Sequence, residues 1–217
     1  MSQNRRAFLG ALAAGGVAAA SMPALAQRKP PDAGIDYKVL DQAQPVEIQG
    51  KIEVMEFFWY GCPHCYAFEP QLTAWVGKVS GDVAFRRLPA QFNATWAQHA
   101  KLYYALESLG EVGRLHKKIF DAIHVEQAQL LQDAEMVAWV ARNGVDRDKF
   151  AAALGSQAVA ARMSTARQSL IAYKIDGVPA MAVNGRFLTA PSITGSHERC
   201  LQVVDYLVEQ ERRGKRA

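Results

Sequence analysis

The feature that most constrains this chain is an apolar segment, residues 52–59, followed closely by the cysteine pair Cys62 and Cys65. The segment is rich in β-branched and aromatic side chains and lies between Gly50 and Gly61, so it predicts a buried strand. Two thiols therefore follow the end of a strand directly, which limits both the fold and the chemistry of the chain.

A helix and a second strand are expected after the cysteines. Apolar residues recur there at spacings of three and four, which predicts a helix that ends at Gly81; they are Phe68, Leu72, Trp75, Val76 and Val79. Residues 83–88 are again apolar and predict a strand. A strand–helix–strand order indicates an α/β layer.

The placement of the two cysteines predicts redox chemistry. In a Cys-x-x-Cys motif at the start of a helix, the sulfurs lie one turn apart, close enough to form a disulfide. Unpaired N–H groups and the positive dipole at the helix N-terminus favour the thiolate of Cys62, the form that attacks disulfides. We therefore expect Cys62 to be the exposed attacking sulfur and Cys65 the buried partner that resolves the mixed disulfide.

The residues between the cysteines fit this assignment. Pro63 is tolerated in the first helical turn because the N–H that it lacks would have no partner there. His64 supplies a positive charge or a hydrogen bond near the Cys62 sulfur, which would lower the pKa of that thiol further. Both are counted among the catalytic residues.

Two other interpretations of the motif remain open. Cys-x-x-Cys is also half of many zinc sites, and His197 with Cys200 would supply two more ligands. An inert structural disulfide is the second alternative, although closing so short a loop stabilises a fold little. The strand–helix context favours redox chemistry, so we expect no metal and no cofactor other than the Cys62–Cys65 disulfide.

Glu56 and the pair Val178-Pro179 are expected near the sulfurs. Glu56 lies in the most apolar strand, where a carboxyl group is costly unless it has a partner or a function, such as relaying the proton of Cys65. The alternative is a glutamate at a strand edge, paired with a lysine. A cis Val178-Pro179 bond would hold the Val178 backbone beside the sulfurs to pair with an extended substrate peptide, whereas the alternative is a trans turn proline.

A helical block interrupts the α/β pattern. Residues 93–168 have helical periodicity and little strand character, with Leu115, Ile119 and Ile123 on one helix face and Asp133 as an expected N-cap. The β pattern returns at residues 180–189, where Asn184-Gly185 predicts a hairpin with a two-residue type I′ turn. Ser196 is then expected to cap a last helix that runs through Arg212.

Other cysteine and histidine residues are assigned no chemistry. Cys200 falls at helical spacing from apolar residues and is interpreted as a small buried hydrophobe. His99, His116 and His124 lie on predicted helices without the spacing of metal ligands, and are interpreted as surface or satisfied helix residues.

Residues 1–26 are expected to be a signal peptide. Arg5 and Arg6 precede a short uncharged apolar stretch, and Ala24-Leu25-Ala26 fits a cleavage site, so the mature protein would begin near Gln27. The arginine pair also resembles the twin-arginine export pattern, so the general secretory and twin-arginine routes both stay open. Removal of the signal peptide would lower the formal net charge of the chain from +4 to about +2. This small charge gives no argument for nucleic-acid binding.

The segments Glu56–Glu69 and Gly177–Gly185, with the Cys62-Pro63-His64-Cys65 motif, resemble the DsbA family of thiol:disulfide interchange proteins. The resemblance implies a thioredoxin fold with an inserted helical domain: 27–91 as the first part of the thioredoxin domain, 92–167 as the insertion, and 168–217 as the second part. It also implies a buried acid at Glu56, a cis-proline at Pro179 and a substrate groove with apolar rims. Cys200 and the twin-arginine-like signal are departures that the family pattern does not require.

The resemblance implies a periplasmic dithiol oxidase that donates the Cys62–Cys65 disulfide to reduced, newly exported proteins. A DsbB-type quinone reductase of the inner membrane would reoxidise it, and we expect a monomer because no dimerisation segment is evident. One alternative is a reductase or isomerase on the same fold. The other is a non-catalytic zinc- or peptide-binding protein.

Overall fold

The computed structural model describes residues 29–214, so the expected signal peptide, residues 1–26, lies outside the described part of the chain. Those residues contain a mixed sheet in the order β1-β5-β4-β2-β3. Only β2 and β3 are parallel; the other neighbours are antiparallel. The strands are β1 Lys38–Val39, β2 Ile52–Phe58, β3 Val83–Pro89, β4 Ala180–Val183 and β5 Phe187–Thr189.

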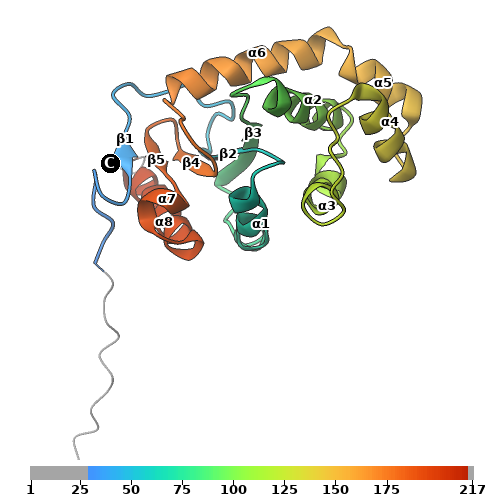
Figure 1. Cartoon of the computed structure of the whole chain (residues 1–217). Helices are drawn as coiled ribbons and strands as arrows, with labels where there is room; N and C mark the ends of the chain where they lie inside the picture. The colour runs from blue at the N-terminus through green and yellow to red at the C-terminus, as the bar shows by residue number, and fades with distance from the viewer. Residues whose placement is uncertain (1–28, 215–217) are drawn as a thin grey trace, which may run out of the picture.

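The helices cover both faces of the sheet and extend beyond one edge of it. They are α1 Pro63–Val76, α2 Ala94–Ser108, α3 Val112–His124, α4 Asp133–Arg142, α5 Arg147–Leu154, α6 Gln157–Ala172, α7 Pro191–Thr194 and α8 His197–Gly214. Figure 1 shows α1, α7 and α8 below the sheet, α6 above it, and α2 to α5 beside β3. The α/β frame with an inserted helical block is therefore confirmed. None of the described helices is long and apolar enough to cross a membrane.

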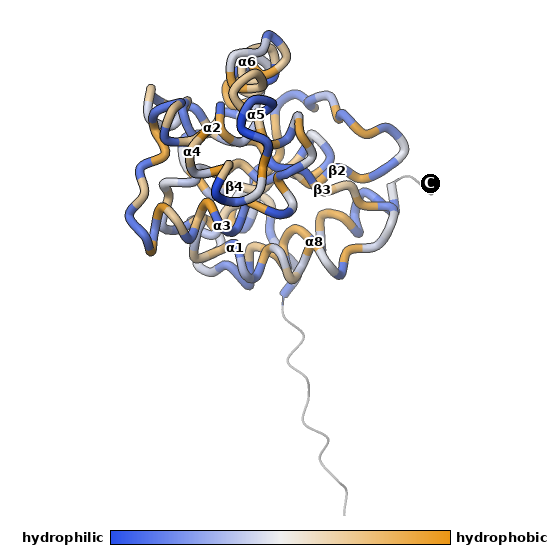
Figure 2. Tube along the Cα trace, turned by 90° about the vertical axis from the view of Figure 1, so that its right-hand side faces the viewer, coloured by the Kyte–Doolittle hydropathy of each residue, from blue (hydrophilic) through white to orange (hydrophobic). Residues whose placement is uncertain are grey.

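Strand β2 is buried on both faces, and its alternation divides the core into two clusters. Ile52 and Val54 pack with Phe68 and Leu72 of α1 and with the inner face of α8. Met55 and Phe57 belong to the other cluster, which extends through α2 to α6. In Figure 2, α8 alternates between apolar and polar colours along its length, as expected for a helix with one buried face.

Two helix ends differ from the predictions. Helix α1 ends at Val76, with Gly77 as its C-cap, rather than at Gly81. Val79 still packs against the core from the turn that follows, so its apolar spacing does not require a helix. Asp133 is the first residue of α4 and Gln132 is its N-cap, so the prediction is off by one residue; the Asp133 carboxylate pairs with Lys101 of α2, at 2.7 Å.

The predicted hairpin is present, with a longer loop than expected. Asn184 and Gly185 both have positive φ, 50° and 67°, and Arg186 N donates to Val183 O across the turn. The register nevertheless pairs Val183 with Phe187, so residues 184–186 separate the paired positions. Gly185 cannot be replaced without strain, because its φ is positive and the Gln44 backbone occupies the space of a Cβ.

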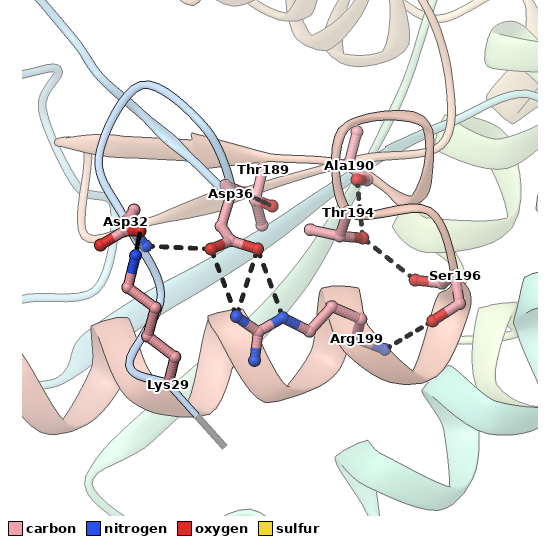
Figure 3. A network of polar contacts seen from close by, with 8 residues as sticks. All are labelled: Lys29, Asp32, Asp36, Thr189, Ala190, Thr194, Ser196 and Arg199. Carbon is pink, nitrogen blue, oxygen red and sulfur yellow. Dashed lines mark hydrogen bonds and ion pairs between the residues drawn. The ribbon is translucent and has the colours of Figure 1, made fainter.

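The segment before β1, residues 29–37, is hydrogen-bonded to β5 and α8. Figure 3 shows Asp36 receiving hydrogen bonds from the Arg199 guanidinium of α8, and the Thr189 hydroxyl donating to the Asp36 carbonyl at 2.8 Å. Ser196 Oγ accepts from Arg199 N at 3.0 Å, which confirms its capping role at the start of α8. These bonds fix the position of α8 beside the redox motif.

The inserted helices join the sheet through α6. Helix α6 runs without interruption through the expected boundary between residues 167 and 168, and ends at Ala172. Tyr173, its C-cap, packs its ring edge-on against Phe57 of β2, with centroids 5.2 Å apart. The end of the insertion therefore belongs to the core of the sheet.

Candidate functional site

The cysteine pair lies where β2 passes into α1. Cys62 is the N-cap of α1, Pro63 follows in the first turn, and Cys65 lies one turn further. A turn connects the strand to the helix, and in it Cys62 N donates to Trp59 O at 3.0 Å. Both cysteines are free thiols, Cys62 7 % exposed and Cys65 fully buried. The predicted order of exposure is correct, although Cys62 is less accessible than expected.

The pKa values of the two thiols are shifted in opposite directions. The Cys65 thiol, which donates to the Cys62 sulfur, is the main cause that lowers the pKa of Cys62 to about 6. Burial opposes this lowering of the Cys62 pKa. The backbone N–H groups of Cys65 and His64 and the charge of His64 contribute to it. Burial raises the pKa of Cys65 well above its ordinary value, and the neighbouring Cys62 raises it further. Cys62 is therefore the thiolate-forming sulfur at neutral pH.

The cis-proline loop lies against the attacking sulfur. The Val178-Pro179 bond is cis, as predicted. Cys62 Sγ lies 3.6 Å from Val178 O, so the backbone of this loop borders the sulfur. The binding of substrate by Val178 and Pro179 stays a prediction.

Glu56 is buried on a central strand rather than at an edge. It is 1 % exposed and lies opposite Arg87 of β3, whose Nε is 3.0 Å from Glu56 Oε2. Burial raises the pKa of Glu56 to about 8, although Arg87 opposes the shift. The alternative of a strand-edge glutamate paired with a lysine is therefore wrong in both position and partner.

Arg87 joins Glu56 to a second carboxylate that the sequence did not single out. Its Nη2 donates to both oxygens of Glu69 on α1, at 2.8 and 3.1 Å. The Thr73 hydroxyl also donates to Glu69, at 2.7 Å. His116 and Arg87 hold the pKa of Glu69 below its usual range against the effect of burial, so Glu56 is the carboxyl group that keeps a proton. Glu69 lies four residues after Cys65, on the same helix face, and this spacing is the sequence feature that indicates its place near the site.

Three histidines of the insertion surround the segment that precedes Cys62. His116 Nδ1 lies 2.9 Å from the Tyr60 hydroxyl, and His124 Nε2 lies 2.8 Å from the Tyr60 carbonyl. The ring of His99 stacks near Trp59, with centroids 5.8 Å apart. Burial lowers the pKa of His116 to about 4 and also lowers that of His99, so both are neutral at pH 7. Of the two alternatives for these histidines, surface positions or satisfied helix residues, the second holds for His99 and His116, which are buried and hydrogen-bonded.

Cys200 is a buried thiol, as predicted. It packs with Val204 and Leu207 of α8, and burial raises its pKa to about 12. Within residues 29–214 no three or more His, Cys, Asp or Glu side chains are grouped to hold a metal ion. The ring of His197 instead packs against Phe68, with centroids 5.0 Å apart.

A groove of about 610 Å³ opens beside the motif. His64, Val178 and Pro179 line it on the side of the sulfurs, and Ser192, Ser196 and His197 line it on the side of α7 and α8. Its lining combines apolar Val178, Pro179 and Pro191 with two imidazoles and two hydroxyls. The apolar rims of the substrate groove that the resemblance implies stay a prediction.

Comparison with known proteins agrees with this geometry. Residues 53–199 match the family described as the DSBA-like thioredoxin domain. The thiol:disulfide interchange protein DsbA of Azotobacter vinelandii is 45% identical over 210 residues, covering 96% of this chain and 98% of that protein. The crystal structure of Pseudomonas aeruginosa DsbA superimposes with a TM-score of 0.84 at 42% identity, over 86% of this chain and 97% of that one. NmDsbA1 from N. meningitidis is more distant, at 26% identity and a TM-score of 0.76.

Proposed function

Because the chain belongs to the DsbA family of thiol:disulfide interchange proteins, we propose that it donates its Cys62–Cys65 disulfide to reduced proteins exported to the periplasm. The observation that supports transfer of the disulfide from this protein to its substrates, rather than the reverse, is the lowered pKa of Cys62. A thiol that ionises readily is a good leaving group, and its stabilised thiolate favours the reduced enzyme. The disulfide is then a strong oxidant of its substrates.

The exchange takes place in two displacements. A substrate thiolate attacks Sγ of Cys62, the Cys62–Cys65 bond breaks, and Cys65 leaves as a thiolate that takes up a proton. A second substrate thiolate then attacks the substrate sulfur of the mixed disulfide and releases Cys62 as a thiolate. The substrate loses two electrons to the enzyme, which ends as the dithiol.

Glu56 is suited to supply the proton that Cys65 takes up. Its charge is among those that raise the pKa of Cys65, which indicates that the two groups are close. Its own pKa, raised to about 8 by burial, keeps it protonated near neutral pH. Val178 and Pro179 would pair with the substrate backbone next to the attacked sulfur, since Val178 O lies beside Cys62.

Membership of the family also supports the assignments of partner and compartment. Reoxidation of Cys62 and Cys65 by a DsbB-type quinone reductase of the inner membrane would close the cycle, with no metal or organic cofactor in this chain. The A-x-A site at residues 24–26 supports export to the periplasm by the general secretory or the twin-arginine route. The small formal charge of the expected mature chain gives no argument for nucleic-acid substrates.

The alternative is a reductase or isomerase on the same fold, and redox equilibration against glutathione separates the two. A dithiol oxidase remains largely reduced in a glutathione buffer that keeps a reductase oxidised. Cys65→Ser is expected to accumulate mixed disulfides with exported proteins, whereas the matched variant Cys62→Ser should accumulate none. A pair that stays oxidised in reducing buffer would contradict the oxidase assignment.

A further inference from the structure

One face of α3 is directed at Tyr60, two residues before Cys62. His116, Phe120 and His124 follow one another at intervals of four residues, so they lie on the same side of the helix. The ring of Phe120 packs edge-on against the ring of Tyr60, with centroids 5.1 Å apart. The sequence shows this stripe, but its partner lies more than fifty residues earlier in the chain.

The two histidines hold Tyr60 at opposite ends. His116 Nε2 lies 3.4 Å from Glu69 Oε2, so the N–H of that ring faces the carboxylate and Nδ1 accepts from the Tyr60 hydroxyl. His124 Nε2 donates to the Tyr60 carbonyl at 2.8 Å. A fully buried side chain and its own backbone are thus fixed by a single helix of the insertion.

His124 also contacts the other flank of the redox motif. Its ring lies parallel to that of Tyr66, with centroids 4.7 Å and planes 4° apart. The Tyr66 hydroxyl donates to Asp121 of the same helix, at 3.0 Å. Tyr66 directly follows Cys65, so His124 touches both sides of the Cys62–Cys65 segment.

The Tyr60 carbonyl belongs to the turn that sets the start of α1. That turn is closed by the bond from Cys62 N to Trp59 O, at 3.0 Å, and Cys62 O accepts from Tyr66 N at the same distance. The orientation of the first N–H groups of α1 around the Cys62 sulfur depends on this turn. A donor that holds the Tyr60 carbonyl therefore acts on the sulfur through the backbone.

We propose that His124 is a positioning residue for disulfide exchange, whose hydrogen bond to the Tyr60 carbonyl holds the turn that presents Cys62. The inserted helical domain would in this way contribute to the reactivity of the dithiol without touching the substrate. This inference rests on the proposed exchange at Cys62, but its test needs no substrate protein.

Two replacements separate the hydrogen bond from the packing of the ring. His124→Phe keeps a ring against Tyr66 but has no donor, whereas His124→Gln keeps a donor without a ring. The pKa of Cys62 is measured from the ultraviolet absorbance of the thiolate in reduced protein, and the redox equilibrium is measured against glutathione. Lys118→Ala, on the exposed side of α3, serves as the control.

The variant without a donor, His124→Phe, is expected to raise the pKa of Cys62 by about one unit. At pH 8, above both pKa values, this shifts the glutathione equilibrium by about tenfold toward the disulfide. His124→Gln should stay within about threefold of the wild type. Equal shifts in both variants, or no shift in His124→Phe, would overturn the proposal. If His124→Phe does not fold, His124→Met, which matches glutamine in length, replaces it. A wild-type pKa near 8.5 would contradict the proposed function instead.

Discussion

Glu56 and Arg87 face each other across β2 and β3, with Arg87 Nε 3.0 Å from Glu56 Oε2, close enough to Cys65 for Glu56 to affect the pKa of its thiol. Arg87 is shared with Glu69, so a single, partly buried cation faces two buried carboxylates. Burial and the neighbouring Glu69 raise the pKa of Glu56, so Glu56 is the carboxyl group that we propose as the proton donor to Cys65.

Glu56→Gln is expected to gain stability relative to the wild type as the pH rises. The unfolded chain releases the Glu56 proton near pH 4.3, whereas the folded protein holds it until about pH 8. The unfolded state therefore binds fewer protons in this range. Because Glu56 ionises in the unfolded chain but not in the folded one, the folded wild type becomes progressively less stable between these pH values. Denaturant melts of reduced protein at pH 4.5 and pH 7 should show a relative gain on the order of 3 kcal/mol.

The same variant should exchange disulfides more slowly, because it cannot supply a proton to Cys65. The matched control is Glu53→Gln, which alters the other carboxylate of β2, paired with Arg86 at 3.1 Å. That control should leave the exchange rate unchanged. A normal rate in Glu56→Gln would contradict the relay role.

Arg87→Met is expected to destabilise the protein by about 3 kcal/mol, because it leaves the ionised Glu69 carboxylate buried without its cation and removes the hydrogen bond from Arg87 to protonated Glu56. Chemical denaturation of reduced protein at pH 7 measures the loss, and Arg87→Lys should recover part of it. The loss should be smaller at pH 4, where Glu69 can be protonated in the variant as well as Glu56. A loss of stability that does not depend on pH would indicate that Arg87 stabilises the fold through packing rather than through its charge.

The stability of reduced protein should depend on the ionisation of Cys62. The pKa of this thiol is lowered from about 8.5 in the unfolded chain to about 6 in the folded one. The thiolate therefore stabilises reduced protein fully above pH 8.5, by about 3 kcal/mol, and by about 1 kcal/mol at pH 7. The contribution is lost as the pH falls through 6. Urea melts from pH 5 to pH 9, with Cys62→Ser as the reference, measure it.

The oxidised form and two further variants serve as controls for that experiment. Oxidised protein has no thiolate and should be less stable than reduced protein at pH 7; the opposite order would point to a reductase. Cys65→Ala should raise the pKa of Cys62 more than His64→Ala does, because the Cys65 thiol is the largest cause of the shift.

Cys200 should react with thiol reagents only after unfolding. It is fully buried, and its raised pKa of about 12 leaves almost no thiolate at neutral pH. Cys200→Ala is expected to retain the redox equilibrium of Cys62 and Cys65. Labelling of Cys200 in native protein by iodoacetamide at the rate of a free thiol would reveal a redox role.

Local sequence was sufficient for the redox motif and for the elements that carry it. Cys62, Pro63 and Cys65 were placed at the start of a helix because capping and backbone geometry act within a few residues. The same holds for the positive-φ turn at Asn184-Gly185. The cis bond at Pro179 was expected from its place before the hairpin.

The charge and hydrogen-bond partners of the site were decided by tertiary structure. Arg87 meets Glu56 only through the pairing of β2 with β3, and Glu69 meets them only where α1 packs on that pair. His116 and His124 reach Tyr60 only because the insertion folds back on the motif. Periodicity identifies which face of a helix is buried, but it does not identify the partner of that face. That choice depends on long-range packing, and here it sets the protonation of Glu56 and the support of the turn before Cys62.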